Sequence, residues 1–326
     1  MDFNQIIGHE KVIETLKRSI NKGTVSHSYI FEGEEGLGKK KIAYIFAKTL
    51  LCKEQKDEPC NHCTSCMKFD KGNHPDLLVI EPEKGLIKKG EVEALIKSVT
   101  KAPFESLRKI FIIDDSHKMN LEAKNALLKT LEEPPGYINI ILITSSSNLL
   151  LPTILSRCQG IKFYPVDSKK IADLLISLYG KSKDEAKFIA DFSKGSVGKS
   201  IELATSDSFF QKRDEIIKLI DNLLKGDKTK AISSIGFFND NKENIEEILD
   251  IFSFWFRDLI IYKELGDNDL IINSDKIEYL SRQSFIHFNK INDIIDKVQQ
   301  TKENINRNIN FQLSIETMLL NIQEEF

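Results

Sequence analysis

The sequence predicts an α/β domain built on a parallel five-stranded sheet, followed by a purely helical region. Five apolar segments of strand length lie in the first half of the chain, and segments with helical periodicity separate them. Uninterrupted apolar runs suit strands that are buried on both faces, as in a parallel sheet. The strand pattern ends at Pro165, so an all-α region is expected beyond it.

The expected strands are rich in β-branched and other apolar residues. They are SYIFEG (28–33), LLVIEP (77–82), KIFIIDD (109–115), NIILITSS (139–146) and GIKFYP (160–165). The segments between them place apolar side chains on one face of a helix, as Val12, Leu16 and Ile20 do. This alternation of strands and helices predicts a doubly wound domain over residues 1–166.

Helical patterns fill the rest of the chain. Three short helices are predicted over residues 168–180, 183–193 and 198–206, and Gly180 and Gly195 separate them. Longer helical patterns follow from residue 209 to the end. We therefore expect a small helical domain over residues 167–208 and a larger one over residues 209–326.

Composition and charge limit the classes of function. The chain has 326 residues, of which 41% are hydrophobic and 29% charged, as in globular proteins with substantial cores. Its 46 Lys and Arg residues are balanced by 49 Asp and Glu residues, and the net charge is −3. This balance excludes a globally basic nucleic-acid-binding protein. The N-terminal residues lack the layout of a signal peptide, and we expect a cytoplasmic protein.

A glycine-rich segment follows the first expected strand and opens a helix. Gly33, Gly38 and Lys39 satisfy the pattern G-x-x-x-x-G-K, and Gly36 lies inside the loop. In this context the backbone N–H groups, the helix N-terminus and the lysine can bind phosphate. The segment is a candidate nucleotide-binding loop, and the alternative is an ordinary glycine-rich turn.

The position after Lys39 departs from the phosphate-loop pattern. Ser or Thr there supplies a hydroxyl oxygen to Mg²⁺, which takes oxygen ligands. Lys40 stands there instead, and an ammonium group has no lone pair for a metal. A phosphate could still bind, but ATP with Mg²⁺ is a doubtful ligand and hydrolysis is expected to be weak or absent.

Two acidic residues, Asp114 and Asp115, end the apolar segment KIFIIDD. In phosphate-loop ATPases an acid at the end of this strand holds the metal, and the next residue is usually Glu. Asp115 is one methylene shorter than Glu. Two alternatives stay open for Asp114: it could pair with Lys40, which the spacing permits, or simply end a strand.

Four cysteines lie between the first long helix and the second strand. Cys52, Cys60, Cys63 and Cys66 have the spacing C-x7-C-x2-C-x2-C, which in a cytosolic chain is typical of a metal site rather than of disulfides. Four thiolates complete the tetrahedral shell of Zn²⁺, so the site is expected to be structural. The alternative is four reduced thiols in a surface insertion. His62 lies inside the cluster but is not needed as a ligand.

These motifs, in this order, resemble the clamp-loader subunits of bacterial DNA polymerase III, which are AAA+ proteins with a RecA-like core. The resemblance covers residues 1 to about 210 and includes HSYIFEGEEGLGKKK, NHPDLLVIEP, IFIIDDSHKMN, LLKTLEEPP and LPTILSRCQ. LLKTLEEPP followed by SRC is specific to clamp loaders. The remaining residues are similar only in being helical, and in this family that region is an oligomerising collar that follows a helical lid.

The resemblance implies roles and partners. Ser156 and Arg157 would carry an arginine finger that acts on ATP in a neighbouring subunit, and the insertion at about residues 50–70 would bind zinc. The implied partners are the ATPase subunits (gamma/tau) and the delta subunit, with the sliding clamp and primer–template DNA reached through the complex. Without the resemblance, Arg157 would be interpreted as an exposed residue in a surface ion pair.

Three departures favour the non-hydrolysing delta-prime type over the hydrolysing gamma/tau type. Lys40 replaces the hydroxyl residue, Asp115 replaces Glu, and Gly198 stands where hydrolysing subunits usually have Arg. The preferred hypothesis is a clamp-loader subunit with little or no intrinsic ATPase activity. The alternatives are an ATP-hydrolysing clamp-loader subunit and a zinc-containing nucleic-acid-binding module, which the net charge disfavours.

Overall fold

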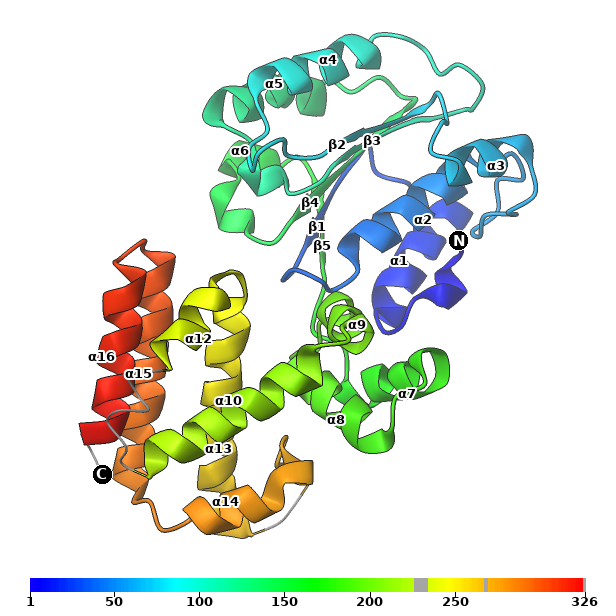
Figure 1. Ribbon diagram of the computed structural model, residues 1–326. Helices are drawn as coiled ribbons and strands as arrows, with labels where there is room; N and C mark the ends of the chain where they lie inside the picture. Colours follow the sequence, from blue (N-terminus) through cyan, green and yellow to red (C-terminus); the bar gives the residue numbers. More distant parts are fainter. Residues whose placement is uncertain (226–233, 267–268, 325–326) are drawn as a thin grey trace. The chain divides into compact units, whose positions relative to one another are not determined.

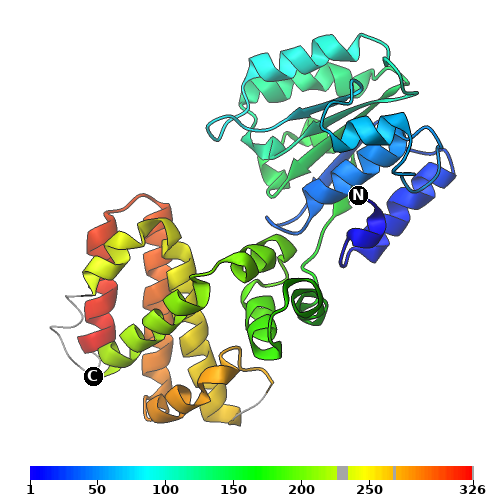
Figure 2. The same ribbon diagram turned by 45° about the vertical axis from the view of Figure 1, so that its right-hand side comes forward.

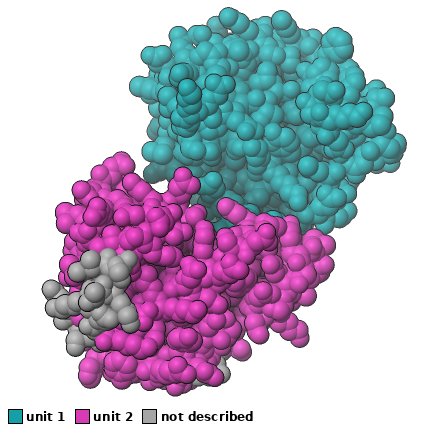
Figure 3. Space-filling model, in the orientation of Figure 1, with its two compact units in different colours: residues 1–171, 193–201 teal, residues 172–192, 202–326 magenta. Residues whose placement is uncertain are grey.

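The computed structural model describes residues 1–225, 234–266 and 269–324. The contacts divide the chain into two compact units (Figure 3). The first unit comprises residues 1–171 and 193–201, and the second comprises residues 172–192 and 202–326. All of the sequence motifs considered above lie in the first unit.

Five parallel strands form the sheet of the first unit. They are β1 (Ser28–Glu32), β2 (Leu77–Ile80), β3 (Lys109–Ile113), β4 (Ile138–Thr144) and β5 (Gln159–Lys162). Their order in the sheet is β2-β3-β4-β1-β5. Because the strands are parallel, their carboxyl ends lie at one edge, where the loops can gather polar side chains.

Helices cover both faces of this sheet (Figures 1 and 2). On one face, α1 (Glu10–Asn21) and α2 (Lys39–Leu51) share a core with Phe31 and Ile112. On the other face, the core contains Ile30 and Phe111 together with residues of α4 (Lys89–Val99), α5 (Leu121–Glu132) and α6 (Pro152–Leu155). Successive strand residues point to opposite faces, so both are buried, which explains the uninterrupted apolar runs.

A short helix, α3 (Thr64–Asp70), belongs to the cysteine insertion between α2 and β2. Phe69 of α3 packs edge-on against Tyr44 of α2, with ring centroids 6.2 Å apart. Phe69 also joins the hydrophobic core on the α1–α2 face of the sheet. The insertion therefore packs on α2, the helix that directly follows the glycine-rich loop.

Beyond the sheet, the regular secondary structure of the described residues is helical. The longer helices are α7 (Ser168–Tyr179), α8 (Lys183–Phe192), α9 (Val197–Thr205), α10 (Phe209–Leu224), α12 (Ile235–Asp240), α13 (Ile245–Leu265), α14 (Ile277–Gln283), α15 (Phe288–Asn306) and α16 (Phe311–Glu324). Single 3₁₀ turns occur at Phe3–Gln5, Ser116–Lys118, Ser147–Leu149, Lys242–Asn244 and Ser274–Lys276. No helix among the described residues is long and apolar enough to cross a membrane.

The helices of the second unit surround an aromatic core. Phe252, Trp255 and Phe256 of α13 are fully buried. The indole N–H of Trp255 donates to Oε1 of Gln283 at 2.8 Å, as a buried Trp requires. These aromatic residues therefore stabilise the unit itself.

The predicted fold class, an α/β core with a parallel five-stranded sheet and a helical region after it, is confirmed. Each strand ends one to three residues before the end of its predicted segment. The terminal Gly, Pro and acidic residues of those segments belong to loops at the carboxyl edge, because such residues favour turns. The predicted domain boundaries after residues 166 and 208 stay predictions.

Candidate functional site

The glycine-rich loop between β1 and α2 is closed over its own lysine. Gly38 has a φ of 88° and forms the N-cap of α2, whose first residue is Lys39. The buried Nζ of Lys39 donates hydrogen bonds to the backbone oxygens of Gly33 at 2.6 Å and Glu34 at 2.5 Å. Burial lowers the pKa of Lys39. The ammonium group that would contact a phosphate is thus directed into the loop itself.

The next three backbone oxygens of the loop also accept hydrogen bonds from other segments of the first unit. These contacts are Ser196 Oγ to Glu35 O at 3.3 Å, Gly198 N to Gly36 O at 2.8 Å, and His9 Nε2 to Leu37 O at 2.8 Å. Five successive carbonyl groups, from residue 33 to residue 37, are therefore held by the protein. The loop keeps its shape without a ligand.

Gly36 and Gly198 allow the start of α9 to approach the loop. Gly36 has a φ of 76°, in the region that favours glycine. A Cβ atom on Gly198 would lie 3.0 Å from Cα and 3.1 Å from O of Gly36. Any side chain at residue 198 would therefore force the two segments apart. A glycine at residue 198, where Arg is usual in hydrolysing subunits, therefore allows this close packing.

Lys40 bridges two carboxylates at the carboxyl edge of the sheet. Its Nζ lies 2.9 Å from Oδ2 of Asp114 and 2.9 Å from Oε1 of Glu81. Burial alone would lower the pKa of Lys40, but the hydrogen bonds to Asp114 and Glu81 raise it above its ordinary value. The structure thus contains the Lys40–Asp114 pair that the sequence spacing permits, and Lys40 stays positively charged at physiological pH.

Asp115 lies beside this bridge but is engaged elsewhere. Its φ of 46° is left-handed, and it forms the N-cap of the 3₁₀ turn Ser116–Lys118. Its Oδ2 accepts a hydrogen bond from Nζ of Lys118 at 2.7 Å. The structure therefore brings Lys39, Lys40, Asp114 and Asp115 to one edge of the sheet, with each charged group already paired or hydrogen-bonded.

Arg157 lies just after the C-terminal end of α6 and forms an ion pair. Its Nη2 lies 2.8 Å from Oε1 of Glu132, at the end of α5. Its Nη1 donates to Thr153 O at 2.9 Å and to Ser156 Oγ at 3.3 Å. The Arg157 side chain is one third exposed, so this surface pair contributes little to stability.

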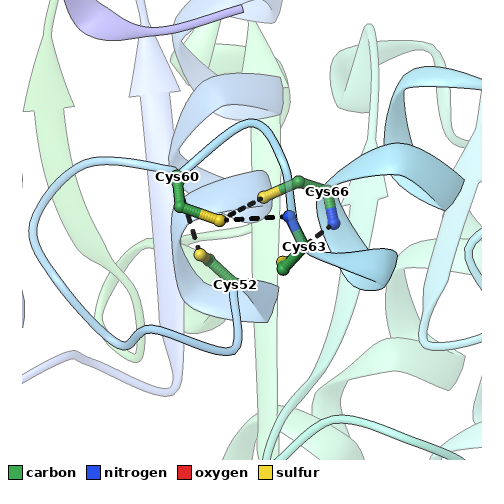
Figure 4. A group of neighbouring side chains, drawn as sticks. All are labelled: Cys52, Cys60, Cys63 and Cys66. Atoms are coloured by element: carbon green, nitrogen blue, oxygen red, sulfur yellow. Dashed lines mark hydrogen bonds between the residues drawn. The ribbon is translucent and has the colours of Figure 1, made fainter.

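The four cysteine sulfurs converge between α2 and α3 (Figure 4). Each Sγ of Cys52, Cys60, Cys63 and Cys66 lies within 4.8 Å of the others, and none of these cysteines forms a disulfide. The sulfurs of Cys60 and Cys66 are 4.0 Å apart. A zinc tetrahedron with Zn–S bonds of about 2.3 Å has sulfur–sulfur edges of about 3.8 Å. The four sulfurs therefore fit one Zn²⁺ ion.

Backbone N–H groups already point at three of these sulfurs. Cys60 N donates to Cys52 Sγ at 3.4 Å, Cys63 N to Cys60 Sγ at 3.3 Å, and Cys66 N to Cys63 Sγ at 3.4 Å. Burial acts to raise the pKa of Cys63, but hydrogen bonds that include N–H groups of Cys66 and Lys53 lower it to about 6. Burial raises the pKa values of Cys60 and Cys66. These donors stabilise the thiolates that a metal needs.

A bound Zn²⁺ would crosslink the insertion and leave no open coordination position for chemistry. His62 is exposed and pairs with Glu54 at 2.9 Å. Glu54, Cys60 and His62 form a second group with metal-ligand spacing. The four-cysteine set fits zinc better, because thiolates bind this ion more strongly than an exposed carboxylate does.

Sequence reasoning missed three partners of these residues. Glu81 follows β2, and Asp114 follows β3; the register pairs Ile80 with Ile113, so neighbouring parallel strands deliver both acids to Lys40. The segment LLKTLEEPP contained Glu132, the partner of Arg157. The contact between Gly198 and the loop could not be predicted from the spacing of residues in the sequence.

Comparisons with known proteins agree with the motifs. A family model described as DNA polymerase III, delta subunit, matches residues 8–167, and one described as the C-terminal part of that subunit matches residues 207–324. The DNA polymerase III subunit delta' of Bacillus subtilis (strain 168) is 34% identical over 319 residues, which cover 96% of each chain. Subunit tau of the same organism is 28% identical over 310 residues, 86% of this chain and 54% of tau.

Among solved structures, a DNA polymerase III gamma subunit-related protein from Thermotoga maritima is 19% identical, with a TM-score of 0.44, and the match covers 96% of this chain and 99% of that one. The two family models together span most of the chain, and the delta' relative matches nearly its full length. The chain therefore belongs to the DNA polymerase III clamp-loader subunit family.

Proposed function

We propose that this chain is a delta-prime-type subunit of the DNA polymerase III clamp loader, which does not hydrolyse ATP itself. It assembles in the cytoplasm with ATPase subunits of the gamma/tau type and with the delta subunit. The complex loads the sliding clamp onto primed DNA. In this assembly residues 167–208 form a lid and residues 209–326 a collar that binds the other subunits. The full-length similarity to a delta' subunit supports this assignment over tau, which this chain matches over half of tau's length.

One observation carries the non-hydrolysing role: the ammonium group of Lys40 bridges Asp114 and Glu81. In a phosphate-loop ATPase, Asp114 would face Mg²⁺ together with a Ser or Thr hydroxyl. Here the lysine supplies the positive charge from the protein itself and offers no oxygen ligand. A divalent cation at this place would have to displace a cation that is covalently part of α2.

The shape of the loop supports the same conclusion. Lys39 donates to the backbone oxygens of Gly33 and Glu34, and the start of α9 closes the loop through Gly36. Binding of a triphosphate would have to break the Lys39 contacts before the lysine could reach a phosphate. That cost has no compensation from Mg²⁺, so nucleotide affinity is expected to be low.

Arg157 is the residue that this chain would contribute to catalysis, in trans. A guanidinium placed on the transferring phosphoryl group neutralises charge in the transition state. In GTPases such a residue increases the rate by roughly 10³–10⁵-fold. In the isolated chain Arg157 pairs with Glu132, and this weak surface pair must open when Arg157 reaches the neighbouring nucleotide.

The experiment compares wild type, Arg157→Ala and Arg18→Ala in a clamp loader assembled from purified subunits. Arg18 is a matched control, because it is also an Arg in a surface ion pair, 2.9 Å from Glu14. Arg157→Ala is expected to lower DNA-stimulated ATP turnover at the neighbouring site by about 10³-fold, with assembly unchanged. Equal turnover for all three proteins would contradict the proposed role of Arg157.

The second candidate is an ATP-hydrolysing subunit of the gamma/tau type. It is favoured by one observation: Gly33, Gly38, Lys39 and Asp114 keep the phosphate-loop pattern in the correct strand–loop–helix context. Under this alternative the isolated chain would turn over ATP in the presence of Mg²⁺. The bridge formed by Lys40 argues against it.

A further inference from the structure

An irregular loop, residues 103–108, exposes two large apolar side chains next to the cysteine insertion. Phe104 is 82% and Leu107 70% exposed. We propose that the cysteine insertion is the support of this loop, and that metal bound by the four cysteines sets the loop's conformation. A continuous set of polar contacts joins the two segments.

The first contact in this set is the carboxylate of Asp76, which holds the backbone of the loop. Asp76 is completely buried. Its Oδ1 accepts a hydrogen bond from the N–H of Phe104 at 2.5 Å, and its Oδ2 accepts from the N–H groups of Glu105 and Ser106, both at 2.9 Å. Three hydrogen bonds to one buried carboxylate define the loop's path, because charge-assisted bonds are about twice as strong as neutral ones.

His74 connects Asp76 to the insertion. Its Nδ1 accepts a hydrogen bond from the N–H of Asp76 at 3.1 Å, so the proton of the neutral ring is on Nε2. Burial lowers the pKa of His74 and favours this neutral form. Nε2 then donates to Ser65 Oγ at 2.9 Å, and Ser65 Oγ donates to Leu51 O at 2.7 Å.

Two further contacts tie the loop to the insertion directly. Lys68 of α3 forms an ion pair with Glu105. Ser106 Oγ donates to Leu51 O at 3.4 Å, the same oxygen that accepts from Ser65. Apart from the ion pair with Lys68, the polar contacts therefore end on Leu51 and Ser65, and each of these two residues directly precedes a cysteine of the cluster.

The helix that presents Ser65 and Lys68 is too short to be stable alone. Helix α3 has seven residues, whereas isolated helices shorter than about 12 residues are marginal in water. Its N-cap is Cys63, whose sulfur accepts from Cys66 N in the first turn. A metal bound to both cysteines would fix this turn, which is otherwise held by the hydrogen bonds from Cys66 N to Cys63 Sγ at 3.4 Å and from Met67 N to Cys63 O at 2.9 Å.

A second anchor holds the other end of α3. The Nζ of Lys48, a fully buried residue of α2, donates to Asp70 Oδ1 at 2.7 Å and to Asn61 Oδ1 at 2.6 Å. Loss of the metal is therefore expected to loosen the first turn of α3 and the loop that depends on it, while the sheet stays folded. The metal acts at a distance on residues that it does not touch.

Hydrogen exchange measured by mass spectrometry tests this coupling on the full chain. Zinc-loaded protein is compared with protein stripped by a chelator, and the amides of residues 104–106 are compared with those of β4. Because each of the three amides donates to a charged group, exchange there should be about tenfold faster, or more, after stripping. Unchanged exchange at residues 104–106, or equal acceleration in β4, would overturn the proposal.

A variant tests the path itself with the metal still bound. His74→Ala removes the link between Asp76 and Ser65, and exchange at residues 104–106 should rise by about tenfold while zinc content stays equal to that of wild type. Lys56→Ala is the matched control, since Lys56 lies in the same insertion and its side chain pairs with Glu54, outside the path from Asp76 to Ser65. Unaltered exchange in His74→Ala would overturn the proposal even if the stripped protein were to unfold.

Discussion

The phosphate loop and the cysteine insertion both have the pattern of a ligand site, and they differ in what satisfies their charged atoms. In the loop, Lys40 neutralises Asp114 and Glu81, and Lys39 donates to the loop's own oxygens. In the insertion, four sulfurs face one another, and three of them accept hydrogen bonds from backbone N–H groups. Thiolates that meet in this way repel one another unless a cation lies between them.

This difference shows how to distinguish a motif whose ligating atoms are open to a ligand from one whose ligating atoms are already paired with the protein's own side chains. A motif indicates which residue types are present, whereas function depends on whether their ligating atoms are free for a ligand. The loop keeps Gly33, Gly38 and Lys39, but the acidic groups beside it are already paired with Lys40 of the same chain. The four sulfurs of the insertion fit an external cation. The predictions below test the two halves of this comparison.

The largest effect is expected from loss of one cysteine ligand. Cys63→Ser should remove the bound zinc, about one ion per chain in wild type, and lower the free energy of unfolding by about 4 kcal/mol, the value for a ligand present at about 1,000 times its Kd. Elemental analysis and urea denaturation measure the two quantities. Cys158→Ser, outside the cluster, is the control that should keep its zinc. A wild type whose free energy of unfolding is the same with and without zinc would contradict this half of the comparison.

Zinc affinity should depend strongly on pH. Binding must displace the protons of Cys60 and Cys66, whose pKa values burial raises, whereas the Cys63 thiol, with a pKa of about 6, is already ionised at neutral pH. Each displaced proton increases the affinity about tenfold per pH unit, so the protons of Cys60 and Cys66 alone give a factor of at least about a hundred between about pH 7 and pH 8. Competition with a chelator at these two pH values measures the slope. A flat profile would mean that these thiols do not bind the metal.

In the metal-free protein, the lowered pKa of Cys63 contributes stability at pH values above the pKa of the unfolded chain. That contribution is lost as the pH falls through about 6. Below this pH, zinc release and the loss of this contribution therefore both lower the stability of the insertion. Acid should destabilise the insertion before it affects the sheet.

A smaller effect is expected where α9 closes the phosphate loop. Gly198→Ala places a Cβ about 3 Å from the backbone of Gly36, so the free energy of unfolding should fall by about 1–2 kcal/mol. Gly90→Ala is the matched control: it lies in helix α4 with open space around its Cα and should be neutral or stabilising by about 0.5 kcal/mol. Denaturant titration compares the two variants, and equal stability would show that the loop is not held by this contact.

Much of the fold could be predicted from the sequence because its signals are local. The apolar runs identified all five strands, and the glycines at residues 180 and 195 separated the three short helices that follow. The strand order could not be predicted, because it depends on pairing between segments distant in sequence. Without the strand order, the sequence spacing could not predict that Glu81 and Asp114 lie close together.

Part of the geometry of the candidate site could also be predicted. The cysteine spacing predicted one shared metal site, and the four sulfurs lie within 4.8 Å of one another. Lys40 indicated that the phosphate loop departs from the usual pattern, and the roles of these residues stay predictions. The roles of Gly198 and Asp76 depend on backbone contacts, which no residue pattern encodes. Gly198 was interpreted as a missing Arg, whereas in the structure it is also a packing requirement.

The central claim is that the protein's own lysine fills the cation position of the phosphate loop. The most direct test is ATP turnover by the purified chain alone, measured with and without Mg²⁺ for wild type and Lys40→Thr. The account predicts no Mg²⁺-dependent turnover in wild type, and nucleotide binding that becomes dependent on Mg²⁺ in Lys40→Thr, because Asp114 and the new hydroxyl can then hold the metal. Mg²⁺-dependent ATP turnover by the wild-type chain alone would contradict the account and identify an ATP-hydrolysing subunit.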